Sequence, residues 1–349
     1  MNMTLHLNNR QIAIISVLKK QGFGSLSAIF EQLGLAVAER TINRDLAELV
    51  ELGIIFTQGG GRSLVYALSL PGRFFLPIDV LAYNEQEPDN RVGVLPRYQF
   101  EVWKAWPVSL FEPDTVAALQ NQTTRYQKSL AEQSADVRVR ELERFVIEMS
   151  WKSARIEGNT YTLLDTERLL KEGIVSPTNT PEETQMILNH KTAFSFVREQ
   201  SIGTTVTRAY IEQVHTLLMQ NLLTDIGMRK NGVGITGSNY RPLDNQFQIQ
   251  EALDALIILV NSRESVFDKA LTILLGISYI QPFVDGNKRT ARLIANGILL
   301  AHGAAPLSYR NVDEVLYRAS LLAFYEQLSV LPMRDIFLEQ YTFSIEHYG

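Results

Sequence analysis

From Asp114 to the C-terminus, apolar residues recur at the three-and-four spacing of amphipathic helices, and this pattern limits the fold more than any other feature. The pattern is clearest in seven segments: Val137–Trp151, Thr162–Leu170, Glu182–Arg198, Thr207–Leu222, Gln250–Asn261, Phe267–Ile280 and Thr290–His302. One irregular stretch, Gly227–Asn245, interrupts them. We therefore predict a mainly α protein with an all-helical domain over residues 114–349.

The first 70 residues predict a winged helix-turn-helix domain, because short helices are followed by two strands. The expected elements are a helix at Gln11–Lys20, a short helix capped by Ser25, a longer helix from Ala38 to Leu52, and strands at Ile54–Thr57 and Ser63–Leu68. Residues 71–113 differ, since prolines at positions 71, 77, 88, 96, 107 and 113 disfavour long helices. We expect this segment to be an irregular connector packed on the core.

The composition of the chain excludes several classes of protein. The chain of 349 residues contains no cysteine, which excludes disulfides, thiol catalysis and cysteine-ligated zinc and fits a reducing cytoplasm. Met1–Ile15 lacks the features of a signal peptide, and apolar stretches such as Leu271–Ile280 are too short to span a bilayer. We therefore expect a cytoplasmic protein without a membrane partner. Because the net charge is −5, any nucleic-acid binding must come from a local basic patch.

The segment Gln281–Arg292, with the sequence QPFVDGNKRTAR, predicts a phosphate site. A buried helix breaks at Pro282, and a new helix begins near Asn287. The glycine in the turn between them lets backbone N–H groups point toward one place, next to the positive end of the new helix.

Charged side chains strengthen this prediction. Arg289 and Arg292 lie three residues apart at the helix start, so both can hold phosphates on the same side. Asp285 offers a hard oxygen ligand for Mg²⁺. An ordinary helix-loop-helix with a basic first turn would show the same spacing, so the residues alone leave both interpretations open.

The segment resembles the active-site motif of the Fic family, His-x-Phe-x-Asp/Glu-Gly-Asn-Gly/Lys-Arg-x-x-Arg. It matches every defined position except the first, where Gln281 replaces the family's catalytic histidine. The resemblance extends from about Pro96 to the C-terminus. It implies an all-helical Fic fold and a protein adenylyltransferase, which transfers AMP from ATP to a Ser, Thr or Tyr hydroxyl of a protein target or of the chain itself.

The resemblance also implies roles for individual residues. Asp285 would hold Mg²⁺ on the phosphates, Arg289 would act in catalysis by holding the phosphates, and Arg292 would clamp the γ-phosphate. The implied nucleotide-binding set is Gly286, Asn287, Lys288, Arg289 and Arg292. Position 281 is the catalytic position of the family, but the amide of Gln281 is neither a useful base nor an acid near neutral pH. Loss of a general base typically slows a reaction by about 10²–10⁴-fold.

A second motif, Ser153-Ala154-Arg155-Ile156-Glu157-Gly158, resembles the family's inhibitory pattern Ser/Thr-x-x-x-Glu-Gly/Asn. The resemblance implies that Ser153, Glu157 and Gly158 form an inhibitory element. Glu157 would pair with Arg292 and so keep this arginine from the γ-phosphate. Ser-x-x-x-Glu alone is common in helices, so the prediction depends on the longer match over residues 151–160.

A third match concerns the irregular stretch at residues 227–242, which resembles the family's flap, a short β-hairpin. An exposed hairpin edge can pair with an extended target segment. The implied target-docking residues are Ile235, Gly237 and Tyr240. A plain hairpin loop is the alternative.

In the N-terminal domain, Glu39–Leu49 resembles the recognition helix of DeoR-like winged-helix regulators. The implied DNA-contacting residues are Arg40, Thr41, Asn43 and Arg44 on this helix and Arg62 at the wing tip. We expect DNA binding as a homodimer on a palindromic site. Residues 1–70 hold six basic and five acidic residues, so a protein-interaction or dimerisation role stays open.

Three hypotheses follow. The first is a Fic-like adenylyltransferase that binds ATP and Mg²⁺, is inhibited by Glu157 and is impaired or altered at Gln281. The second is a DNA-binding transcriptional regulator whose degenerate Fic domain senses nucleotide. The third is an active enzyme in which Gln281 is an engineered substitution.

Overall fold

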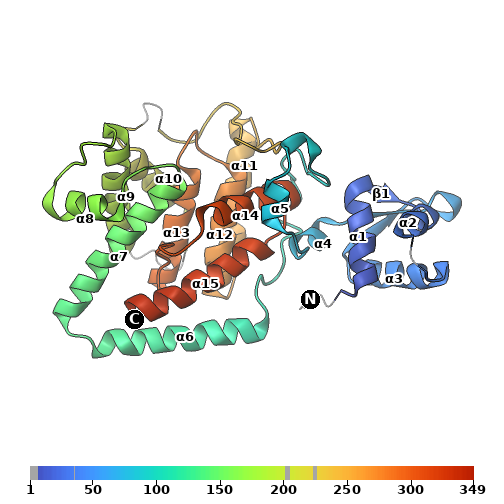
Figure 1. Cartoon of the computed structure of the whole chain (residues 1–349), viewed down its shortest axis with the longest axis horizontal. Helices are drawn as coiled ribbons and strands as arrows, with labels where there is room; N and C mark the ends of the chain where they lie inside the picture. Colours follow the sequence, from blue (N-terminus) through green and yellow to red (C-terminus); the bar gives the residue numbers. More distant parts are fainter. Residues whose placement is uncertain (1–6, 35, 201–204, 223–225) are drawn as a thin grey trace. The chain divides into compact units, whose positions relative to one another are not determined.

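The computed structural model describes residues 7–34, 36–200, 205–222 and 226–349 (Figure 1). The chain divides into two compact units. The first unit contains Met1–Val108, Gly234–Arg241 and Leu322–Pro332, and the second contains Ser109–Val233, Pro242–Leu321 and Met333–Gly349. This division differs from the boundaries expected at residues 70 and 113, because two segments of the C-terminal half pack with the N-terminal unit.

The first unit begins with three helices and a three-stranded antiparallel sheet. The elements are α1 (Asn9–Gln21), β1 (Phe23–Gly24), α2 (Leu26–Leu33), α3 (Glu39–Glu51), β2 (Ile55–Gln58) and β3 (Val65–Leu68). The strand order is β1-β3-β2, so Ala67 in β3 has Phe23 on one side and Phe56 on the other. Ser25 caps α2 as expected, since its hydroxyl accepts a hydrogen bond from the N–H of Ala28 at 3.3 Å.

A single apolar core holds these elements together. Ile42, Leu46 and Leu49 form the buried side of α3, and Ile14 and Leu18 of α1 pack in the same cluster. The predicted winged helix-turn-helix is therefore confirmed, with the short strand β1 in addition.

Residues 71–108 of the connector also belong to the first unit. The connector contains two short helices, α4 (Leu70–Phe74) and α5 (Val80–Asn84). The fully buried carboxylate of Glu326 accepts hydrogen bonds from the Tyr83 hydroxyl at 2.7 Å, from Arg91 Nη1 at 3.2 Å and from the Ser238 hydroxyl at 2.7 Å. Glu326 thus joins the connector to the segments Gly234–Arg241 and Leu322–Pro332 of this unit.

The helices and strands assigned in the described residues of the second unit are all α-helices. Its helices are α6 (Pro113–Glu132), α7 (Ala135–Ile156), α8 (Leu163–Glu172), α9 (Pro181–Glu199), α10 (Arg208–Met219), α11 (Gln246–Asn261), α12 (Val266–Ile280), α13 (Asn287–Ala301), α14 (Glu314–Gln327), which continues into the first unit, and α15 (Leu331–Tyr348). The mainly helical fold class is thus confirmed.

The helices α12 and α13 form the centre of this unit (Figure 1). Every residue of α12 after Val266 is buried, and so are the residues of α13 from Asn287 to Leu299 except Lys288. The helices α7, α9, α10 and α11 contact this pair. The loop that joins α12 to α13 is therefore held at both ends by tightly packed helices, and this loop carries the predicted phosphate motif.

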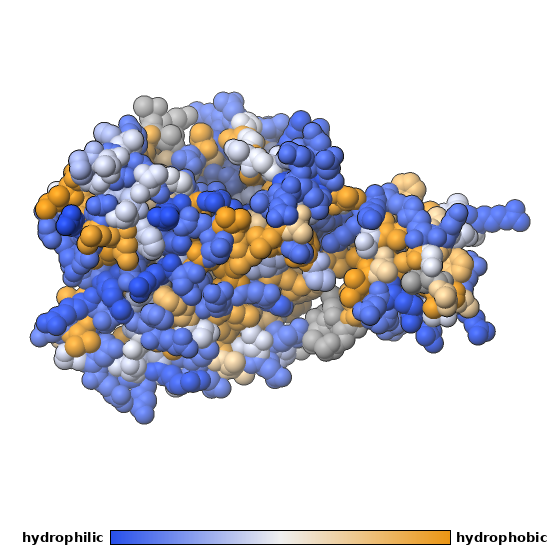
Figure 2. Space-filling model, in the orientation of Figure 1, coloured by the Kyte–Doolittle hydropathy of each residue, from blue (hydrophilic) through white to orange (hydrophobic). Residues whose placement is uncertain are grey.

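In the view of Figure 2, hydrophilic residues cover most of the visible face and apolar residues are scattered among them. None of the helices in the described part of the chain is long and apolar enough to cross a membrane.

Candidate nucleotide site

The loop between α12 and α13 is closed by the side chain of Asn287. Its Oδ1 accepts a hydrogen bond from the N–H of Phe283 at 2.9 Å, and its Nδ2 donates to the carbonyl of Phe283 at 2.8 Å and to Gln281 Oε1 at 2.9 Å. Gly286 has a left-handed backbone, with φ of 79°, and is the N-cap residue of α13. The amide groups in the first turn of α13 have no acceptors within the helix, so they are available to an anion. The side chain of Asn287 is bonded within the loop. Its backbone N–H is therefore the group that Asn287 can offer to an anion.

Gln281 takes part in the same loop. Its backbone is left-handed, with φ of 52°, and its Nε2 donates a hydrogen bond to the carbonyl of Ser278 at 2.7 Å. Its Oε1 accepts the hydrogen bond from Asn287. Both polar atoms of the amide thus have partners within the loop, and the residue acts as part of the scaffold.

Arg289, in the first turn of α13, is buried with 2% of its surface exposed. Its Nη2 donates to Asp285 Oδ2 at 3.0 Å and contacts the sulfur of Met219 at 3.5 Å. Its Nη1 is buried and has no hydrogen-bond partner among the described residues. Burial lowers the pKa of this guanidinium, which means that an anionic partner would be favourable here. A buried donor without an acceptor fits a phosphate oxygen.

Asp285 offers a carboxylate oxygen that a metal ion can reach. Its side chain is largely exposed and pairs with Arg289. No group of three or more His, Cys, Asp or Glu side chains gathers as a metal site in the described residues. A Mg²⁺ ion at Asp285 would therefore need phosphate oxygens and water as its other ligands, which is common for this ion. The residues present fit such a shared site.

Glu157 follows α7 and bridges two cations of α13. Its Oε1 lies 3.0 Å from Arg292 Nη2, and its Oε2 lies 2.7 Å from Lys288 Nζ. We call Glu157, Arg292 and Lys288 the Glu157 cluster. Burial alone would raise the pKa of Glu157, but attraction to Arg292 and Lys288 outweighs it and lowers the pKa to about 2. The carboxylate is therefore ionised at neutral pH. The predicted pair of Glu157 and Arg292 is present, and Lys288 is a partner that the sequence did not indicate.

Arg292 is fully buried and has further partners. Its Nε donates to the Ser153 hydroxyl at 2.9 Å, and its Nη2 donates to the Ser153 carbonyl at 2.8 Å. The ring of Tyr317, from α14, lies 5.5 Å from the guanidinium carbon. Since the Ser153 hydroxyl accepts from Arg292, it can donate its own proton to His190 Nε2 at 2.7 Å. Ser153 thus fixes the arginine through both its backbone and its side chain.

Two histidines, His190 and His215, lie beside the loop and the Glu157 cluster. Burial lowers the pKa of His190 to about 3 and that of His215 to about 4, so both are neutral at pH 7. His215 stacks on Phe283 at 3.7 Å, and its Nε2 donates to the Asp285 carbonyl at 3.0 Å. Both rings therefore support the loop and the Glu157 cluster.

The predicted flap differs from a hairpin. In the described residues 226–242, the only bridge in the second unit joins Met228 to Phe283. The buried Arg229 explains this pairing, because its Nε donates to the Gln281 carbonyl at 2.6 Å and its Nη2 to the Ile280 carbonyl at 3.3 Å. These carbonyls end α12 and would otherwise lack donors. The segment therefore pairs with the motif loop instead of folding back on itself.

The residues predicted to dock a target belong to the first unit. Tyr240 is buried and stacks on Tyr325 with ring centres 6.0 Å apart. The carbonyl of Gly237 accepts a hydrogen bond from Arg91 Nη1 at 2.7 Å, and Ile235 is half-buried in the turn before it. Tyr240, one of the residues predicted to dock a target, is thus buried, and its aromatic ring is part of the core of this unit.

The predicted DNA-binding residues lie on the surface of the helix-turn-helix domain. Arg40, Asn43 and Arg44 are exposed on α3, Thr41 is half-buried beside them, and Arg62 is exposed in the turn between β2 and β3. Together they form one basic and polar surface of α3 with a separate arginine in the wing.

Gly286→Ala tests how tightly the loop is built. A Cβ at this position would lie 2.6 Å from the sulfur of Met219, and the backbone has φ of 79°. We expect the variant to lose about 1–3 kcal/mol of unfolding free energy in a urea titration. Gly173→Ala is the matched control, because Gly173 has φ of 72° but open space around it. Equal losses in the two variants would show that the contact with Met219 does not constrain the loop.

Comparisons with known proteins agree with this architecture. Residues 205–299 match the Fic/DOC family, and residues 10–65 match the DeoR-like helix-turn-helix domain. The chain is 23% identical over 178 residues to protein adenylyltransferase fic-1 of Caenorhabditis elegans and 27% identical over 168 residues to protein adenylyltransferase Fic of Nematostella vectensis. These matches cover 49% and 47% of this chain but 35% and 39% of the relatives. The chain thus spans little more than a third of the length of either relative.

Solved structures show the same fold. Fic-1 of C. elegans superposes with a TM-score of 0.56 at 20% identity, covering 67% of this chain and 70% of the other. A Fic family protein of Desulfovibrio desulfuricans gives a TM-score of 0.56 at 22% identity and covers 71% of this chain and 76% of the other. A Fic domain containing signaling protein of Bacteroides thetaiotaomicron gives 0.53 at 20% identity, with 67% and 97% covered. The chain therefore contains a Fic/DOC domain that matches over residues 205–299 and a DeoR-like helix-turn-helix domain that matches over residues 10–65.

Proposed function

We propose that this chain is a Fic-type protein adenylyltransferase that Glu157 holds in an inactive state. The Glu157 cluster carries the proposal. Arg292, the arginine that the motif assigns to the γ-phosphate, is fully buried and its Nη2 is already bonded to a carboxylate. A triphosphate that approached Arg292 would meet the negative charge of Glu157, and like charges at such short range repel strongly in a buried site.

The remaining groups support nucleotide binding. The first-turn amides of α13 and the unpartnered Nη1 of Arg289 supply donors for phosphate oxygens. Asp285 would hold Mg²⁺, which neutralises phosphate charge when it is bound. These groups orient the α-phosphate and stabilise the charge that develops on it during transfer.

Gln281 limits the chemistry. In AMP transfer, the target hydroxyl oxygen forms a bond to the α-phosphorus, the bond to pyrophosphate breaks, and the hydroxyl proton must leave. The amide of Gln281 cannot take this proton, and it is bonded to Ser278 and Asn287. We therefore propose that transfer in the wild type is slow even when Glu157 is displaced, because the side chain at position 281 cannot accept the proton.

Incubation with ATP labelled at the α-phosphate tests the proposal. A Glu157→Gly, Gln281→His double variant should label itself or proteins of a lysate, and mass spectrometry should place AMP on a hydroxyl side chain. If neither the variant nor any lysate protein is labelled, the transferase proposal fails.

A second function, DNA-binding regulation, is supported by the exposed face of α3. Arg40, Asn43 and Arg44 are free of the domain core and stand where a recognition helix meets base edges and phosphates. The match of residues 10–65 to DeoR-like domains supports the same proposal.

We expect the protein to retard DNA taken from upstream of its own gene in a mobility-shift assay. Arg44→Ala should weaken binding about tenfold, since a base or phosphate contact of arginine contributes about 1–3 kcal/mol. Arg140→Ala, which removes an exposed arginine from α7, is the control and should bind like the wild type. Lack of retardation at moderate salt would remove the regulator proposal.

A further inference from the structure

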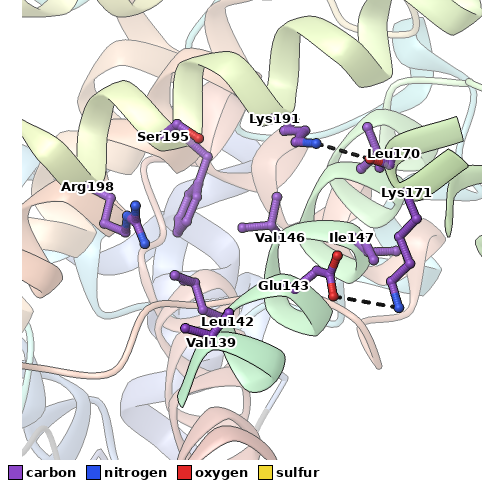
Figure 3. A pocket seen from close by; sticks show the side chains of 11 residues that line it. Val139, Leu142, Glu143, Val146, Ile147, Leu170, Lys171, Lys191, Ser195 and Arg198 are labelled. Atoms are coloured by element: carbon purple, nitrogen blue, oxygen red, sulfur yellow. Dashed lines mark hydrogen bonds and ion pairs between the residues drawn. The ribbon is translucent and has the colours of Figure 1, made fainter. Parts of the chain in front are cut away.

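A groove lies between α7, α8 and α9 on the second unit, away from the residues of the nucleotide site (Figure 3). Its volume is about 330 Å³. Val139, Leu142 and Val146 of α7 line it from one side (Figure 3), and Phe194 of α9 is also among its lining residues. Val139 has 66% of its surface exposed, although it faces a cavity of apolar side chains. The groove is therefore an apolar surface that nothing in the described chain covers.

Positive charges border this apolar surface. Lys171, Lys191 and Arg198 line the groove together with one acidic residue, Glu143. Lys171 is neutralised, since its Nζ lies 3.0 Å from Glu167 and 3.7 Å from Glu143.

The other two cations are available to a ligand. Lys191 donates a hydrogen bond to the carbonyl of Leu170 at 3.1 Å and has no ion-pair partner within the described residues. Arg198 has a single loose pair, at 3.6 Å, with its neighbour Glu199. Counted with Glu167 and Glu199, the rim carries three cations and three anions. Lys191 is the cation that no carboxylate pairs in the described residues, so an anion would bind beside Lys191.

We propose that this groove binds a small amphipathic anion, that is, an apolar chain or ring that carries one carboxylate. The apolar part would cover Val139, Leu142, Val146 and Phe194, which removes apolar surface from water. The carboxylate would lie at the rim and accept hydrogen bonds from Lys191 or Arg198. The volume is at the lower end of the range for small-molecule sites, roughly 300–1,000 Å³, which favours a small ligand over a partner helix.

The position of the groove gives such a ligand a connection to the nucleotide site. The helix α7 continues from Val146 to Ser153, about 10 Å further along its axis, and then to Glu157. On α9, Lys191 directly follows His190, whose ring bonds to the Ser153 hydroxyl. The two helices that enclose the groove are thus the ones that hold the Glu157 cluster in place. The proposed binding itself does not depend on the transferase proposal.

Titration calorimetry with decanoate, kept below its micelle-forming concentration, tests the site on the full chain. We expect saturable binding to the wild type and at least tenfold weaker binding of decan-1-ol, which has the same chain without the charge. A Lys191→Glu, Arg198→Glu double variant should bind decanoate at least tenfold more weakly. Ser195→Trp, which fills the groove without a change of charge, should also weaken it.

Arg140→Glu is the control, because Arg140 is exposed on α7 and does not line the groove. Circular dichroism verifies that each variant is folded, and hydrogen exchange should show that decanoate protects residues 139–147 and 191–198 in the wild type. The proposal is overturned if decanoate does not bind, if decan-1-ol binds equally well, or if the double variant and Arg140→Glu bind alike.

Discussion

A Glu157→Gly, Gln281→His double variant should transfer AMP about 10²–10⁴-fold faster than Glu157→Gly alone, the usual contribution of a general base. An imidazole at position 281 can accept the proton of a target hydroxyl, whereas the amide of Gln281 cannot. The backbone there is left-handed, and histidine is among the residues that tolerate this conformation. The backbone at position 281 should therefore accept the substitution, although the hydrogen bonds of the amide with Ser278 and Asn287 are lost.

Initial rates with labelled ATP measure this effect in four proteins: the wild type, both single variants and the double variant. Gln281→Ala in the Glu157→Gly background is the matched control, because it removes the amide without adding a base. If the histidine variant is no faster than the alanine variant, position 281 does not supply the base in this protein.

Replacement of Glu157 by glutamine should lower the free energy of unfolding by about 3 kcal/mol at pH 7. The reason is that Arg292 and Lys288 lower the pKa of Glu157 from 4.5 to about 2 in the folded protein. A lowered pKa of a carboxyl group contributes stability that is fully present above the unfolded value, near pH 4.5, and is lost as the pH falls toward 2. Loss of the charge also leaves the fully buried Arg292 without its counter-ion.

The pH dependence separates this effect from simple packing. Urea titrations of the wild type and of Glu157→Gln should differ by a constant amount from pH 6 to pH 8 and by a shrinking amount below about pH 4.5. Glu167→Gln is the control, since Glu167 pairs with Lys171 at the surface and such pairs contribute little. A difference that stays constant down to pH 3 would contradict the assigned role of the ion pair.

The sequence was most informative where the residues of a feature are neighbours in the chain. The segment from Gln281 to Arg292 is contiguous, so its glycine, its helix start and its charged residues predicted a loop followed by a helix, and the structure contains this arrangement. The pair of Glu157 and Arg292 is not local. It was predicted only through the resemblance to a family motif, because no rule of spacing brings two residues 135 positions apart together.

Other features depend on tertiary contacts that local patterns do not contain. Lys288 was assigned to an anion site as part of the basic first turn, but it pairs with Glu157 because α7 ends beside it. Tyr317 comes from α14, a helix with little amphipathic pattern to draw attention to it. The two buried histidines could have been suspected only from the apolar residues that surround them in α9 and α10.

The flap shows how a local signal can lead to a wrong prediction. Glycines between residues 227 and 237 are typical of a hairpin, and a loop of this kind was expected. A single buried arginine, Arg229, instead bonds to the end of α12 and holds the first part of the segment against the motif loop. The second part packs in the other unit, with Tyr240 in its core. The positions of Arg229 and Tyr240 depend on contacts with residues far away in the sequence, and glycines in a turn give no information about such contacts.

Calorimetric titration of ATP–Mg²⁺ tests the central claim most directly, namely that Glu157 and the γ-phosphate compete for Arg292. Glu157→Gly should bind ATP at least tenfold more tightly than the wild type, which corresponds to about 1.4 kcal/mol. Binding of AMP, which has no γ-phosphate, should change much less. Equal affinity of the two proteins for ATP, or no binding to either, would contradict the assignment of this site.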